Sequence, residues 1–176
     1  MQKKIFPIIL TAALLVSSLV SLFFIHNLQG NAKVINYAGV VRGATQRLIK
    51  QELNHFPNDA LIGQIEGILE ELQTGQGEHG LTRLDSDEFQ GLIVRMRDEW
   101  EQMKEEIYLV RAGGDTDALF EASEAFFGLA DQTVATAEMF SEKSVRSAQR
   151  SMFILNCAFV LLMVLLYIYS AKQAKR

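Results

Sequence analysis

Two runs of apolar residues, one near each end of the sequence, predict membrane-spanning helices. Residues 5–25 carry no charge over 21 positions, and residues 152–169 carry none over 18. At about 1.5 Å of rise per residue, such runs match the roughly 30 Å hydrocarbon core of a bilayer. The alternatives are buried helices of a soluble core and, for the first run, a cleaved signal peptide, whose apolar region is usually about 7–15 residues long. We favour two transmembrane helices, over 5–25 and 152–169.

Between these runs, apolar residues recur three, four and seven positions apart, which is the spacing of amphipathic helices. Proline and glycine interrupt the pattern three times, so the sequence predicts four helices. We expect the first to end at Phe56, before Pro57, and the second to follow an N-cap at Asn58. The third and fourth are expected to begin near residues 85–86 and 115–116. The glycines that separate them are Gly75, Gly77 and Gly80 before the third helix and Gly113 and Gly114 before the fourth.

These segments predict an all-α fold, in which four helices form an antiparallel bundle standing on the membrane. No alternation of Val, Thr and Tyr and no Asn-Gly turn predicts a strand. Because no glycine or proline lies between Phe140 and Met152, we expect the fourth helix to continue into the second span. The first span should likewise continue into the first helix of the bundle. The aromatic and methionine residues of the third and fourth helices are assigned to the core, namely Phe89, Met96, Trp100, Met103, Phe120, Phe126, Phe127 and Phe140.

The charges are distributed unevenly along the chain. All 21 Asp and Glu residues lie between Glu52 and Glu142, so the middle carries 12 − 21 = −9 and the ends +5, for a net charge of −4. Cations outside both spans place residues 1–4 and 170–176 in the cytoplasm and residues 26–151 on the other side of the membrane. An acidic middle also counts against nucleic acid as a partner, since that partner needs a basic surface. The terminal cations are Lys3, Lys4, Lys172, Lys175 and Arg176.

Little in the sequence supports catalysis or metal binding. The single cysteine, Cys157, excludes an internal disulfide and a cysteine-built zinc site. The three histidines lack metal-ligand spacing, and no phosphate-binding loop or nucleophile elbow occurs. His55 and His79 are assigned to exposed turns, and acidic pairs such as Glu70 and Glu71 to solvated helix faces. We therefore predict no enzyme within this chain, no cofactor and no metal.

The first helix after the membrane contains the one candidate ligand site. Ile35, Arg42 and Ile49 are seven positions apart, so the arginine projects from an otherwise apolar stripe. Gly39 lies one turn before Arg42, and Thr45 lies one turn after it. A guanidinium offers a planar fork of donors to an anion, and the glycine leaves room beside it. The alternative is an arginine that pairs with one of the many acids or extends along the edge of the core.

The stretch from Val34 to Arg47 resembles the ligand-binding helix of bacterial nitrate/nitrite sensor histidine kinases. It is also similar to the N-terminal domain of type IV pilus methyl-accepting chemotaxis transducers. The tail of the stretch, Arg-Gly-Ala-Thr-Gln-Arg, resembles sensor regions found ahead of diguanylate cyclase (GGDEF) domains. The shared pattern is Ile-Asn-x-Ala-Gly-x-x-Arg after the first membrane span, matched here by Ile35, Asn36, Ala38, Gly39 and Arg42.

This resemblance implies a sensory input module of a receptor in the bacterial inner membrane. In the nitrate sensors the glycine and arginine of the motif line an anion pocket at a dimer interface, so we expect a homodimer that binds a small anionic or polar solute. Gly43, Ala44 and Thr45 stand where those sensors have Met-x-Ser, so nitrate itself is not implied. The expected ligand-binding residues are Asn36, Gly39, Arg42, Thr45 and Arg47.

The output of such a receptor is not encoded in these residues. Seven residues follow Tyr169, so a cyclase, kinase or chemotaxis output domain is expected in a longer chain or in a separate protein. An alternative from a different class is a non-sensing membrane scaffold that binds a partner protein through its helical bundle.

Overall fold

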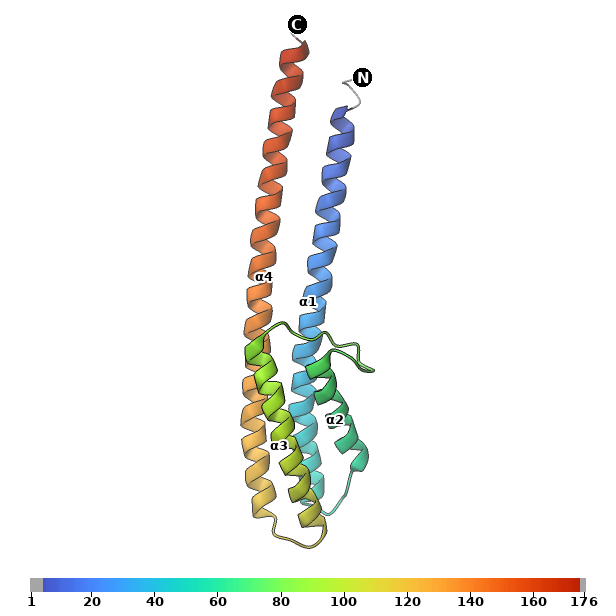
Figure 1. Ribbon diagram of the computed structural model, residues 1–176, viewed down its shortest axis with the longest axis vertical. Coiled ribbons are helices and arrows are strands. Elements are labelled where there is room, and N and C mark those ends of the chain that lie inside the picture. The colour runs from blue at the N-terminus through green and yellow to red at the C-terminus, as the bar shows by residue number, and fades with distance from the viewer. Residues whose placement is uncertain (1–4, 175–176) are drawn as a thin grey trace. The chain divides into compact units, whose positions relative to one another are not determined.

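The computed structural model of the chain describes residues 5–174, which form four α-helices and no strand. The all-α prediction is therefore confirmed. The helices are α1 (Ile5–Glu52), α2 (Asp59–Thr74), α3 (Asp87–Arg111) and α4 (Asp117–Ala174) (Figure 1). Four of the cations used to orient the chain, Lys3, Lys4, Lys175 and Arg176, lie outside the described residues.

The chain divides into two compact units, and both α1 and α4 contribute residues to each. The first unit comprises the residues up to Leu28 and those from Glu142 onward, and the second comprises Gln29–Ser141. Neither α1 nor α4 is interrupted along its length. The expectation that each apolar run continues as helix into the charged middle of the chain is thus confirmed.

In the first unit, α1 and α4 expose many large apolar side chains. Each helix contains a stretch long and apolar enough to cross a membrane, and no residue of either stretch is buried. Leu19 is 66% exposed and Phe153 is 70% exposed, which is unfavourable in water. A helix in the core of a soluble protein would be covered by the rest of the chain. These stretches are not covered, so they fit a membrane protein.

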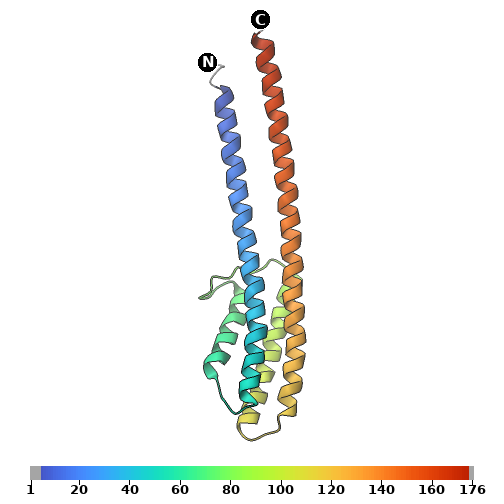
Figure 2. The same cartoon turned by 180° about the vertical axis from the view of Figure 1, so that it is seen from behind.

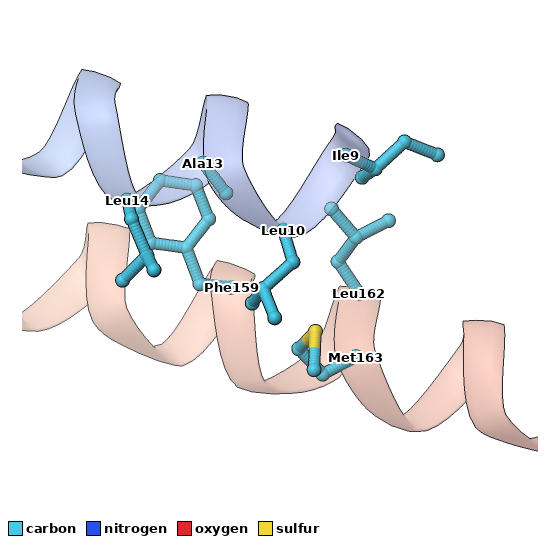
Figure 3. A pocket seen from close by; sticks show the side chains of 7 residues that line it. All are labelled: Ile9, Leu10, Ala13, Leu14, Phe159, Leu162 and Met163. Atoms are coloured by element: carbon cyan, nitrogen blue, oxygen red, sulfur yellow. The ribbon is translucent and has the colours of Figure 1, made fainter. Parts of the chain in front are cut away.

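A small apolar cavity of about 60 Å³ lies between α1 and α4 in this unit (Figure 3). Figure 3 shows Leu10 of α1 and Met163 of α4 on facing sides of the space between the two helices. All of its lining residues are apolar, so it offers no hydrogen bond to a polar ligand. They are Ile9, Leu10, Ala13, Leu14, Phe159, Leu162 and Met163.

The second unit has one hydrophobic core to which all four helices contribute. Figures 1 and 2 show the backbones of these helices from opposite sides. Trp100 of α3 and Phe126 of α4 are fully buried, and their ring centroids lie 6.0 Å apart. Phe120 and Phe127, in contrast, are 55% and 39% exposed, so their assignment to the core was wrong. Consecutive helical residues point about 100° apart, and burial of Phe126 therefore turns Phe127 away from the core. The predicted core residues Phe89, Met96 and Met103 are buried, and Phe140 is partly buried against the core.

Local signals set several helix ends where the sequence predicted them. The Asn58 side chain accepts a hydrogen bond from the Leu61 N–H at 3.0 Å, which caps α2. The Ser86 hydroxyl accepts one from the Phe89 N–H at 3.3 Å, which caps α3. Gly75 ends α2 with a φ of 72°, a left-handed conformation that glycine adopts without steric cost. The N-cap at Asn58 and the break at Gly75 are confirmed.

The end of α1 lies four residues before its predicted position. The last helical residue is Glu52, not Phe56, because the chain turns at His55, whose φ of 60° lies in the left-handed region. The Phe56 N–H donates to the Gln51 carbonyl and the His55 N–H donates to the Glu52 carbonyl, both at 2.9 Å. This is the Schellman motif, which usually has glycine at the left-handed position. A boundary drawn from Pro57 alone does not detect such a turn.

An ion cluster around the buried carboxylate of Glu52 joins α1, α2 and α3 next to this turn. The Arg111 guanidinium donates to both carboxylate oxygens of Glu52, at 2.7 and 2.9 Å, and to Asp59 at 2.7 Å. The Glu52 side chain is only 1% exposed, and the backbone N–H of Asn58 also donates to it, at 3.2 Å. The hydrogen bonds to Glu52 raise the pKa of Arg111 above its ordinary value, although burial lowers it. The cluster fixes the ends of three helices together.

Replacing His55 by glycine should stabilise the protein by about 1 kcal/mol, because a Cβ atom in the left-handed region is sterically unfavourable. Unfolding of the full chain by denaturant in detergent micelles, followed by the fluorescence of the single tryptophan, Trp100, measures the change. His55→Ala is the control, since it removes the imidazole and keeps the Cβ atom. Equal stability of the glycine and alanine variants would contradict the argument.

Arg111→Met should cost about 3–5 kcal/mol in the free energy of unfolding, because it leaves the Glu52 carboxylate buried and unpaired. The same unfolding measurement applies. The double variant Glu52→Leu with Arg111→Met removes both charges and should be clearly more stable than Arg111→Met alone. If the double variant is the less stable of the two, the cost comes from lost packing and not from an unpaired charge.

Candidate ligand site on α1 and α4

Arg42 lies on α1 where that helix meets α4 in the second unit. Its Nη1 atom donates a hydrogen bond to Oδ1 of Asp131 on α4, and the two side chains form an ion pair. The guanidinium also lies over the ring of Phe127, with Cζ 5.8 Å from the ring centroid, which is within the range of a cation–π interaction. One arginine therefore contacts a carboxylate and an aromatic face of the neighbouring helix.

The site is open to solvent. The Arg42 side chain is 36% exposed and the Asp131 side chain 60%. Exposed ion pairs of this kind contribute at most about 1 kcal/mol to stability, because water already solvates both charges well. The pair matches the alternative of an arginine bound to an acid, and it also leaves most of the guanidinium donors available to a solute.

Of the other predicted site residues, Gly39 lies one turn from Arg42 on α1, whereas helix geometry turns Asn36 and Arg47 about 120–140° away from Arg42. Asn36 and Arg47 are exposed, and Gly39 is partly exposed. A Cβ atom placed on Gly39 would meet nothing within 4 Å, and the same holds for Gly43, one turn further along α1. The space that the glycines leave beside Arg42 is therefore open surface.

Thr45 points in a different direction from the other predicted site residues. It is only 1% exposed, and its hydroxyl is buried with no hydrogen-bond partner among the described residues. Three positions along a helix is a rotation of about −60°, which turns Thr45 from the edge occupied by Arg42 into the core. The structure does not bring Thr45 together with the other site residues.

Sequence reasoning missed the two α4 residues of the site. Asp131 was not singled out, and Phe127 was assigned to the core. The two are four positions apart, so they lie on one face of α4. That spacing could have grouped them, but nothing in the sequence pairs this face with Arg42.

A second titratable cluster lies in the loop between α2 and α3. Glu71 is buried, contrary to its assignment to a solvated face, whereas its neighbour Glu70 is exposed as predicted. The Glu71 carboxylate accepts hydrogen bonds from the backbone N–H of His79 at 3.0 Å and of Leu81 at 2.7 Å, and it contacts His79 Nδ1 at 2.8 Å. Burial raises the pKa of Glu71, but these hydrogen bonds outweigh burial and lower the pKa below its usual value.

His79 lies in the glycine loop as predicted, but its side chain is only 28% exposed and is partly packed. Its ring centroid lies 4.6 Å from that of Tyr37 on α1. The Lys33 ammonium, also on α1, donates to the backbone carbonyl of His79. The loop is therefore fixed to α2 through Glu71 and to α1 through Tyr37 and Lys33. Since each of these groups is used in packing the loop, we assign the cluster a structural role.

Among residues 5–174, no three His, Cys, Asp or Glu side chains are grouped so that they could hold a metal ion. No model of a known protein family matches the chain, and no curated protein matches its sequence. The function is therefore inferred from the chain's own residues.

Glu71→Gln should lower the free energy of unfolding by about 2 kcal/mol, because the amide replaces a charged acceptor of buried N–H groups. Since folding lowers the pKa of Glu71, its stabilising effect is complete above the ordinary carboxyl pKa of 4.5 and is lost as the pH falls through the lowered value. The stability difference between the wild type and Glu71→Gln should therefore be constant at neutral pH and shrink in acid. Denaturant unfolding across a pH series measures it.

The neighbouring exposed residue supplies the matched control. Glu70→Gln removes the same charge one position away and should change stability by less than about 0.5 kcal/mol at any pH. A similar cost for both variants would mean that charge at this end of α2 matters, and not the hydrogen bonds of the loop.

Proposed function

We propose that this chain is the sensory input module of a bacterial transmembrane receptor that binds a small anionic or polar solute at Arg42. The second unit would lie outside the inner membrane as an antiparallel four-helix bundle, and the apolar stretches of α1 and α4 would cross the membrane. Both termini would be cytoplasmic, where an output domain or a separate protein receives the signal.

One observation carries the proposal. A partly exposed arginine links the same two helices that bear the membrane-length apolar stretches, through its ion pair with Asp131. A solute that binds the Arg42 guanidinium changes this link between α1 and α4. Because both helices are continuous, a relative displacement of an ångström or two could pass along them. The solute must bind the two arrangements of the helices with different affinity, or no signal results.

The exposed glycines of α1 support a homodimer along this helix. Glycine in a helix interior costs about 1 kcal/mol relative to alanine, and nothing within this chain packs against Gly39 or Gly43 where a side chain would stand. Glycine at these two positions is explained if a second copy of the chain approaches the backbone of α1 closely there. Phe120 and Phe127 are exposed on α4, the helix to which Arg42 is paired, and a partner would cover them as well.

The likeness of residues 34–47 to sensor helices supports the same function. The motif residues Asn36, Gly39 and Arg42 all lie on the exposed part of α1, where a solute can reach them. Thr45 is excluded from direct contact by its burial, so the solute would bind through Arg42.

Arg42→Ala should abolish stabilisation of the protein by its solute. A ligand present at a hundred times its Kd stabilises the folded state by about 2.7 kcal/mol. The measurement is thermal unfolding of the full chain in detergent micelles, followed by Trp100 fluorescence, against a panel of small anions and amino acids. At least one solute should raise the midpoint for the wild type and leave Arg42→Ala unchanged.

Lys50→Ala is the matched control, since Lys50 is another exposed cation on α1. It should respond to the solute as the wild type does. If no solute in the panel shifts the wild type, the scaffold alternative becomes the better account, with the exposed face of α1 and α4 as its binding surface.

A further inference from the structure

The charge of the candidate site narrows the class of its ligand, provided that the proposed function holds. Arg42 contributes one positive charge, and its partner Asp131 contributes one negative charge. The pair as a whole is neutral. At the pair itself, a simple anion therefore meets no unpaired positive charge.

A simple anion that takes the place of Asp131 on the Arg42 guanidinium must compete with this carboxylate. If the anion displaces this carboxylate, Asp131 loses its partner and remains close to a second negative charge. Like charges at such separations repel each other, and the repulsion is larger near a protein surface than in bulk water. A carboxylate or nitrate alone is therefore poorly matched to the site.

We infer that the ligand is a small zwitterion, such as an α-amino acid or a betaine, which inserts between Arg42 and Asp131. Its carboxylate takes the place of Asp131 on the guanidinium, where two parallel N–H donors can bind both oxygens. Its ammonium group pairs with the Asp131 carboxylate that has been released. Each charge of the protein then regains an opposite charge, and the site stays neutral.

The third residue of the site fits the same ligand. The ring of Phe127 already lies under the Arg42 guanidinium, with 5.8 Å between Cζ and the ring centroid. An aromatic face attracts any cation placed over it, so it can receive the ammonium group of a ligand as the arginine shifts.

Insertion of the ligand also explains why this ion pair would transmit a signal. Arg42 belongs to α1 and Asp131 to α4, so a molecule placed between them separates the two helices at this level. Removal of the ligand restores the direct pair. In the unliganded state the Asp131 carboxylate thus occupies the place on Arg42 that the ligand's carboxylate would take.

The test uses the full chain in detergent micelles and isothermal titration calorimetry with three classes of probe. The zwitterions are the neutral standard amino acids and glycine betaine, the anions are acetate and nitrate, and the cation is methylammonium. At least one zwitterion should bind the wild type ten-fold or more tightly than every anion and the cation. Arg42→Ala should lose that binding.

Asp131→Asn distinguishes the zwitterion from an anion. It should weaken binding of the zwitterion at least ten-fold and strengthen binding of acetate, because the repelling carboxylate is gone. Glu124→Gln is the matched control, an exposed acid on α4 two turns before Asp131, and it should leave both affinities unchanged. Trp100 fluorescence should show the same unfolding midpoint for Asp131→Asn and the wild type within a few degrees, since the pair is exposed.

Two results would overturn the inference, and they differ in what they leave standing. If an anion binds the wild type more tightly than any zwitterion, depends on Arg42 and is indifferent to Asp131→Asn, the ligand class is wrong and the sensory function stands. If no probe of any class binds the wild type, the inference and the proposed function both fall.

Discussion

The structure depends on one constraint: α1 and α4 must each remain helical while their surroundings change along their length. In the first unit their side chains are apolar and exposed, and in the second unit the same helices bury one face in a core shared with α2 and α3. A helix can meet both demands because its backbone hydrogen bonds are internal and need neither water nor a neighbouring strand. The two shorter helices, α2 and α3, then complete the hydrophobic core of the second unit.

Much of the fold was predictable because its signals are local. Asn58 and Gly75 act on residues within one turn of themselves, so the ends of α2 followed from the sequence. Glu52 and Glu71 were not predictable in this way, because their burial depends on partners beyond their own helix turn: Arg111 on another helix for Glu52, and the loop residues His79 and Leu81 for Glu71. Glu52 continues the spacing of buried α1 residues after Leu48, yet only Arg111, 59 positions away, makes a carboxylate acceptable there. The spacing of apolar residues can identify a core position, but it does not identify the residue that neutralises a charge placed there.

The candidate site shows the same division. Arg42 was visible in the sequence because a cation interrupts an apolar stripe within a single helix. Asp131 lies 89 positions away, and no local pattern connects it with Arg42. Thr45 and Phe127 were misplaced because a rotation of only 60–100° separates core from surface on a helix. Thr45 is turned into the core from the edge occupied by Arg42, and Phe127 is turned away from the core by the burial of Phe126. The spacing of apolar residues defines the buried face of a helix only to within about this angle, so it assigns such residues to the core or the surface unreliably.

The polar contacts of the second unit also differ in strength in a way that favours movement of one helix. The Glu52–Arg111–Asp59 cluster and the Glu71–His79 loop connect α1, α2 and α3, and neither includes a residue of α4. Disrupting a buried pair typically costs about 3–5 kcal/mol, whereas an exposed pair such as Arg42 and Asp131 contributes about 1 kcal/mol or less. Under the proposed function, a solute at Arg42 would act on this exposed pair, and α1 would keep its attachment to α2 and α3 while its relation to α4 changes. A shift from 1% to 99% of one state needs about 5.5 kcal/mol of differential affinity. Because the exposed pair contributes little to stability, little of the ligand's binding free energy would be spent on breaking it.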